Sequence, residues 1–159
     1  MQALASSQDF MCNRSDGVHH VKYVISSNNE VKRNFMAAYE LTVSVKTQYL
    51  ENQSDPDRSN YVFAYAVTIK NTGQTAAQVI SRHWVIVDGN EHTQEVRGLG
   101  VVGHQPLLQP GEQFEYTSGT SLTTPQGSMH GAYFCVAEDG EQFEAKIPEF
   151  ILSLPRTLH

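Results

Sequence analysis

The sequence is poor in cysteine and has no long apolar run. Its two cysteines, Cys12 and Cys135, lie far apart, and so low a count argues against a disulfide-stapled scaffold and predicts two free thiols. The longest purely apolar run is only a few residues, far below the roughly 20 needed to cross a bilayer. The N-terminus also lacks the basic and then apolar order of a signal peptide. These absences predict a soluble cytoplasmic protein without a membrane span.

Basic residues are too few to attract a polyanion. The formal net charge is −6, and residues 36–159 carry 7 Lys and Arg against 14 Asp and Glu. Nucleic-acid binding needs clustered Lys and Arg to neutralise phosphates, and an anionic membrane surface attracts the same groups. We therefore expect neither nucleic acid nor a membrane surface as a partner.

A helical period is absent, and the first part of the chain lacks a sustained pattern of any kind. Residues 1–35 are sparse in apolar side chains, although residues 18–25 could form one extended strand. The well-patterned region opens at Met36. We predict a natural domain over residues 36–159, with residues 1–35 as an N-terminal leader, tail or extension.

Apolar and polar residues alternate with a period of two through most of residues 41–152, as in half-buried strands. On the third strand, this period places Ile80, Trp84 and Ile86 on one face, with Arg82 between them. Turns rich in Gly, Pro and Asn separate the strands, and Asn71 to Gln74 is predicted to close a hairpin. About seven strands result, near residues 41–49, 61–70, 77–87, 91–97, 114–118, 129–136 and 143–152.

Short strands at close spacing predict an all-β sandwich or barrel. Trp84 on the third strand, and Tyr133 two residues before Cys135 on the sixth, favour an immunoglobulin or fibronectin-III-like β-sandwich. The second strand has no cysteine that could bridge to Cys135. We expect Cys135 to be a buried and unpaired thiol.

Gly98, Gly100 and Gly103 stand at the GxGxxG spacing of a dinucleotide-binding fingerprint. That motif requires a buried strand before it and a helix after it, whereas residues 92–97 are polar and Pro106 and Pro110 oppose a helix. The first interpretation is a flexible loop where the chain crosses between two sheets. The second is a weak anion or nucleotide site formed by Arg97, Gly98, Gly100, Gly103 and His104.

Metal and catalytic signatures are absent. The histidines of the domain show no ligand spacing and no CxxC accompanies them, so we predict neither a metal site nor a cofactor. No GxSxG elbow surrounds Ser118 or Ser128. No catalytic residue is predicted.

Seven segments in order over about residues 39–159 resemble the ApaG family of small bacterial proteins, often labelled cobalt/magnesium efflux proteins. They are YVFAY at 61–65, HW at 83–84, VRGLGVVGHQP at 96–106, LQPGE at 108–112, YTSG at 116–119, TPQGSMHG at 124–131 and IPEF at 147–150. The resemblance implies a fibronectin-III or immunoglobulin-like sandwich without an assigned catalytic centre. It also implies that similar domains serve as interaction modules inside larger eukaryotic proteins.

Two functions from different classes follow. The first is a non-enzymatic binding module that acts through an unidentified protein partner, with an indirect role in cobalt/magnesium homeostasis because the chain has no span of its own. The alternative is binding or pyrophosphohydrolysis of ATP, GTP or a dinucleoside polyphosphate at the loop from Gly98 to Gly103, with Arg97 as the phosphate cation.

Overall fold

The computed structural model describes residues 8–14, 17–25, 31–35 and 37–155, and the chain divides into two compact units, Met1–Ala38 and Tyr39–His159. In the first unit, β1 (Gln8–Arg14), β2 (Gly17–Ile25) and β3 (Val31–Phe35) form an antiparallel sheet in the order β1-β2-β3. A strand thus covers the segment 18–25. The status of residues 1–35 as a leader stays a prediction.

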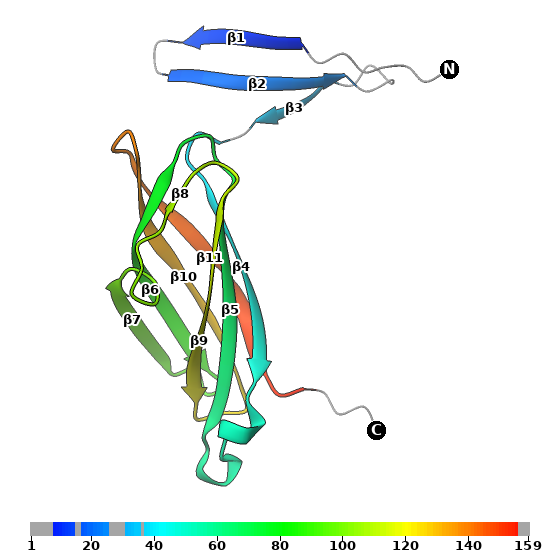
Figure 1. The fold of residues 1–159 in the computed structure, drawn as a ribbon. Coiled ribbons are helices and arrows are strands. Elements are labelled where there is room, and N and C mark those ends of the chain that lie inside the picture. The colour runs from blue at the N-terminus through cyan, green and yellow to red at the C-terminus, as the bar shows by residue number, and fades with distance from the viewer. Residues whose placement is uncertain (1–7, 15–16, 26–30, 36, 156–159) are drawn as a thin grey trace. The chain divides into compact units, whose positions relative to one another are not determined.

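The second unit is a sandwich of two antiparallel sheets (Figure 1). One sheet has the order β4-β5-β9 and the other β11-β10-β6-β7, with β8 also paired to β6. Their bounds are β4 Leu41–Tyr49, β5 Tyr61–Asn71, β6 Ala77–Asp88, β7 Thr93–Leu99, β8 Leu107–Leu108, β9 Gln113–Leu122, β10 Gln126–Ala137 and β11 Gln142–Ser153. Two short 3₁₀ turns, Glu51–Gln53 and Pro56–Arg58, lie between β4 and β5. The predicted immunoglobulin or fibronectin-III-like sandwich is confirmed.

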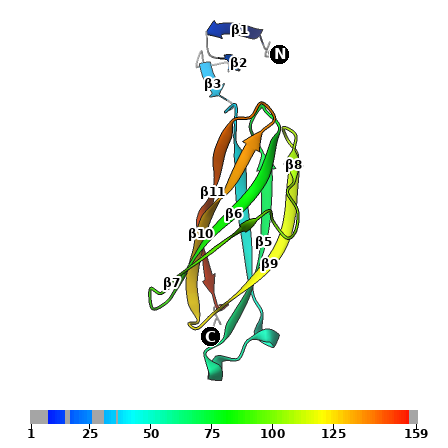
Figure 2. The ribbon, with the colours of Figure 1, turned by 90° about the vertical axis from the view of Figure 1, so that its left-hand side faces the viewer.

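The core lies between the two sheets, which Figure 2 shows nearly edge-on. Trp84 of β6 joins the layers, since its ring contacts Tyr65 of β5 at 5.6 Å and Tyr133 of β10 at 6.2 Å between centroids. Tyr133 is fully buried, and its hydroxyl is hydrogen-bonded to that of Tyr116 on β9. Aromatic pairs of this kind add to the burial energy of the core.

Cys135 is fully buried and is a free thiol, as predicted. It lies in register between Val79 of β6 and Phe143 of β11, and its Sγ is 3.7 Å from the Tyr133 carbonyl oxygen. Burial raises the pKa of this thiol to about 12, because the low-dielectric core disfavours a thiolate. The residue therefore acts as a small apolar core side chain.

The set of alternate residues of β6 that faces the core changes partway along the strand. The cause is a shift in the register of β6 against β10, which lies between Phe134 and Cys135 of β10. Val79 is fully buried, whereas Ile80 is only half-buried. The prediction that Ile80 shares the buried face with Trp84 and Ile86 was wrong, because a bulge moves the alternation by one residue.

Asn71 ends β5 and fixes the passage between the sheets. Its buried Nδ2 donates to the carbonyl oxygens of Thr75 at 2.9 Å and Leu108 at 2.8 Å, and its Oδ1 accepts from the Gly73 amide at 2.9 Å. The turn after Asn71 leads to β6 in the other sheet, so the predicted hairpin at this point was wrong. The amide instead ties this turn to β8.

Candidate functional site

β7 and β8 occupy the same edge of β6, one after the other. Leu99 at the end of β7 is opposite Ser81, whereas Leu107 at the start of β8 is opposite Gln78. Residues 100–106 form an excursion between them that holds Gly100 and Gly103 of the predicted glycine loop, whereas Gly98 lies on β7. The chain then passes through Gly111, which has a φ of 87°, into β9 of the other sheet. The chain therefore crosses from one sheet to the other after β8, whereas the glycine loop lies before β8 and is not at the crossing.

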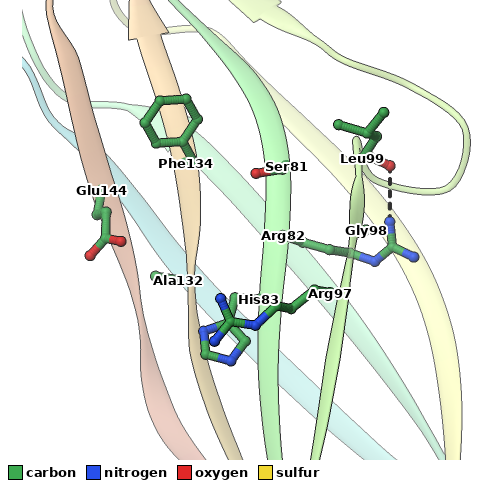
Figure 3. Close-up of a pocket in the computed structure, with 9 residues that line it drawn as sticks. All are labelled: Ser81, Arg82, His83, Arg97, Gly98, Leu99, Ala132, Phe134 and Glu144. Carbon is green, nitrogen blue, oxygen red and sulfur yellow. Dashed lines mark hydrogen bonds between the residues drawn. The ribbon is translucent and has the colours of Figure 1, made fainter.

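A groove with a volume of about 400 Å³ lies beside this edge and includes parts of β6, β7, β10 and β11. Figure 3 shows Arg97 reaching across β6 toward His83, whereas Arg82 points away from both of them. The lining residues are Ser81, Arg82, His83, Arg97, Gly98, Leu99, Ala132, Phe134 and Glu144.

Glu95 pairs with two neighbours on the outer face of this sheet, His83 and Arg97. Glu95 Oε2 accepts a hydrogen bond from His83 Nε2 at 2.9 Å and another from Arg97 Nη2 at 3.1 Å. The bond from His83, with that from Arg97, lowers the pKa of the Glu95 carboxyl. All three side chains reach solvent, so the pairs add little stability. Arg97 is accordingly a cation with a neighbouring carboxylate, and a phosphate would have to compete with Glu95 for it.

Two of the three motif glycines lie in close contact with other atoms, and at Gly100 these atoms are backbone. A Cβ on Gly98 would lie 2.9 Å from Nη1 of Arg82, whose guanidinium donates to the carbonyl oxygens of Leu99 at 3.0 Å and Gly100 at 2.9 Å. Gly100 has a φ of 61°, and a Cβ there would meet the His104 carbonyl oxygen at 2.4 Å. Gly100 therefore allows the loop to fold against its own backbone, whereas the contact at Gly98 is with the end of the Arg82 side chain.

Three amides of the loop are already engaged in hydrogen bonds to backbone carbonyl groups. Gly100 N donates to Ile80 O at 2.7 Å, Val101 N to His104 O at 2.7 Å, and His104 N to Val101 O at 2.9 Å. Gly103 has a φ of 77° and no atom within 4 Å of the position of a Cβ. An anion at the loop tip would thus have to bind near Gly103, away from the three engaged amides.

The candidate anion residues do not converge on one point. Arg97 contacts Glu95 on the outer face of its sheet, whereas the His104 ring packs 5.9 Å from Phe114 on β9 of the other sheet. The proposed set of Arg97, Gly98, Gly100, Gly103 and His104 thus stays a prediction. Arg97, the cation of this set, and His104, its imidazole, lie on different surfaces of the molecule.

Exposed apolar side chains gather at the same edge. The four exposed large apolar residues among those that the structure describes are Leu99 (77% exposed), Val102 (57%), Leu107 (53%) and Ile151 (59%). Three of them fall within residues 99–107. We call Leu99, Val102 and Leu107 the apolar edge. Val102 also has a φ of 48°, which is unfavourable for a β-branched residue.

The apolar edge was not identified from the sequence, although part of the signal was present. Leu107 and Leu108 are adjacent on a strand, so only one of them can face the core, and Leu108 is the buried one. Leu99 continues the outer row of β7 that begins with Glu95 and Arg97. The conformation of Val102 depends on the fold of the loop and has no sequence signature.

Three histidines of the second unit contact partners of other kinds, whereas Nδ1 of His130 is buried without a hydrogen-bond partner in the described part of the chain. His83 is bonded to Glu95, His92 to Asp88 at 3.3 Å, and His104 packs on Phe114. Within residues 8–14, 17–25, 31–35 and 37–155, no group of three His, Cys, Asp or Glu side chains is placed to hold a metal ion. In the same residues, no helix has the length and apolar character to span a bilayer.

Comparisons with known proteins agree on one family. The ApaG domain model matches residues 51–137. Protein ApaG of Ralstonia nicotianae is 63% identical over 124 residues, which cover 78% of this chain and 100% of that protein. Protein ApaG of Bordetella pertussis is 64% identical over 121 residues, covering 76% of this chain and 92% of the relative.

Solved structures give the same result. A crystal structure from Bordetella pertussis, named there as an ApaA protein, is 62% identical, with a TM-score of 0.75 over 77% of this chain and 99% of that one. A second X-ray structure is 48% identical, with a TM-score of 0.71 over 76% of this chain and 91% of that one. The chain described here belongs to the ApaG family.

Proposed function

We propose that this ApaG protein is a cytoplasmic protein-interaction module that binds its partner through the apolar edge. The observation that carries the proposal is the gathering of Leu99, Val102 and Leu107 within nine residues at one edge of a sheet. Exposed apolar groups that cluster in this way mark interaction sites, whereas single ones are ordinary. Any influence on cobalt or magnesium homeostasis would pass through the bound partner.

The strained backbone at Val102 supports the same function. A glycine would adopt a φ of 48° without steric cost, yet a β-branched side chain occupies the position and is more than half exposed. Such strain is unfavourable for the free domain, and it is compensated if the side chain contacts a partner. The apolar edge also adjoins the groove, since Leu99 belongs to both.

Leu99→Asp is expected to reduce partner capture from a cell lysate at least about tenfold, because a carboxylate would be desolvated in an apolar contact. The measurement is quantitative mass spectrometry of proteins retained by the immobilised full chain. Ile151→Asp is the matched control, since Ile151 is exposed to 59% and lies on β11 at the far edge of the same sheet. Equal loss with both variants, or with neither, would contradict the proposal.

Val102→Gly distinguishes binding from folding. This variant removes the side chain and relieves the backbone strain, so we expect a gain in unfolding free energy of about 1 kcal/mol together with weaker capture. A destabilised variant that binds normally would show that Val102 has a purely structural role.

The nucleotide alternative is tested by titrating ATP or a dinucleoside polyphosphate while following backbone amide NMR shifts. With the amides of Gly100, Val101 and His104 already bonded and Arg97 paired to Glu95, we expect no saturable shifts up to millimolar ligand. Saturable shifts confined to residues 97–104 would instead support the alternative. Arg97→Gln should then weaken the binding, and Arg58→Gln, in the loop before β5, should not.

A further inference from the structure

β7 is an open edge strand. Its ladder partner is β6, and no other strand of the described residues pairs with it. It contains no proline, and five of its seven residues are exposed. Edge strands of this length offer unpaired backbone groups to a further strand unless bulges, prolines or covering segments prevent it.

The direction of the free backbone groups follows from the hydrogen bonds at the two ends of the β6–β7 ladder. Asp88 N donates to His92 O at 3.0 Å, and Gly100 N donates to Ile80 O at 2.7 Å. Because antiparallel bonding alternates along a strand, the even-numbered residues between them face β6. The amide and carbonyl groups of Thr93, Glu95 and Arg97 therefore point to the open edge, as does the Leu99 amide. The Leu99 carbonyl oxygen also lies there but already accepts a hydrogen bond from Nη1 of Arg82 at 3.0 Å, so it has one remaining lone pair for a further strand.

We propose that β7 pairs antiparallel with β7 of a second copy of this chain, about a two-fold axis at Val96. In this register Glu95 is opposite Arg97 of the partner, and Arg97 is opposite its Glu95. Thr93 and Leu99 are opposite in the same way, and the two Val96 residues face each other. The result is one continuous sheet through both copies, which is a closed and isologous arrangement.

The pairing of charged side chains favours this register over the neighbouring registers. The open edge permits registers centred on any residue of β7, but a centre at Glu95 places two carboxylates opposite each other and a centre at Arg97 places two guanidinium groups opposite each other. Like charges directly opposite are destabilising in a sheet, and opposite charges are favourable. Among the pairs that form within β7, only the centre at Val96 gives two between Glu and Arg. The bonds from His83 and Arg97 both end on Oε2 of Glu95, so Oε1 can accept the guanidinium of the partner.

The test uses the full chain and two variants that reverse one charge each. Sedimentation equilibrium is expected to show a concentration-dependent dimer for the unchanged protein. Glu95→Arg and Arg97→Glu should each weaken that dimer by roughly tenfold or more, because each creates two like-charge pairs across the axis. Glu144→Arg, on β11 at the opposite edge of the sheet, is the control and should leave the dimer unchanged.

Mixing the two charge variants gives the sharpest result. In a mixed pair, the introduced arginine at position 95 faces the introduced glutamate at position 97, and the native Arg97 of the first variant faces the native Glu95 of the second. We therefore expect native mass spectrometry to show heterodimers in excess over both homodimers. A merely destabilised variant would not regain association in this way. A protein that stays monomeric at several hundred micromolar would overturn the proposal. So would a dimer that both charge variants retain, because it would form through another surface, such as the sheet of β1 to β3.

Discussion

Gly131→Ala is expected to destabilise the β-sandwich by at least about 4 kcal/mol, beyond the usual range for a single substitution. A Cβ on Gly131 would lie 2.0 Å from the carbonyl oxygen of His83 and 3.2 Å from Cα of Trp84. Both are backbone atoms of β6, so no side-chain rotation can relieve the overlap. The substitution therefore forces β6 and β10 apart at the centre of the sheet, where Trp84 and Tyr133 pack.

The control is Gly119→Ala on β9, where a Cβ would lie 3.3 Å from the Phe63 carbonyl oxygen. That contact is tight but is relieved by a shift of a few tenths of an ångström, so we expect a change within about 1 kcal/mol. Urea denaturation of both variants supplies the free energies of unfolding. Similar values for the two would mean that β10 does not approach β6 at Gly131 as closely as the structure shows.

The period of two was sufficient to predict the longer strands of residues 41–153, but not the two-residue β8 or the strands β1 and β3. On β5, Phe63, Tyr65, Val67 and Ile69 alternate with more polar or smaller residues, and all four are buried. Such alternation results from the geometry of a pleated strand and needs no knowledge of its neighbours. For the same reason, the inward orientation of Tyr133 and Cys135 could be predicted.

The strand faces could not be predicted where a bulge interrupts the alternation. The bulge near Ile80 depends on the register of β10 against β6, which is a long-range pairing without a local sequence signal. It buries Val79 in place of Ile80, whereas Arg82, which lies beyond the bulge, shares a face with Trp84 by simple alternation. From there the Arg82 guanidinium reaches the carbonyl oxygens of Leu99 and Gly100, so a charged residue with no evident role in the sequence positions the end of β7.

The loop beside the candidate site was predictable in place, but its internal hydrogen bonds were not. Glycine spacing and Pro106 located a loop near residues 98–106, since both features oppose regular structure. Whether its amides are free depends on the pairing of Val101 with His104 and of Gly100 with Ile80, which only the folded chain defines. The exposure of Leu99 and Leu107 likewise follows from the edge position of β7 and β8.

Cys135→Asp is expected to cost more than about 4 kcal/mol at pH 7, whereas Cys135→Ala should cost roughly 1–2 kcal/mol. The thiol is fully buried between Val79 and Phe143, and the same desolvation that raises its pKa to about 12 would act on a carboxylate. Cys135→Asn, which has nearly the shape of the aspartate variant without its charge, should show an intermediate loss.

The pH dependence of stability distinguishes the effect of the aspartate charge from the effect of its shape. Burial raises the pKa of the introduced carboxyl above the roughly 3.9 of an unfolded chain, so the folded aspartate variant binds the proton more tightly than the unfolded one. Its stability relative to Cys135→Asn is therefore highest below about pH 4 and declines as the pH rises through the folded-state pKa. Urea denaturation of both variants from pH 4 to pH 8 measures this difference. A difference that does not change with pH would mean that the carboxylate reaches water and that Cys135 does not face the core.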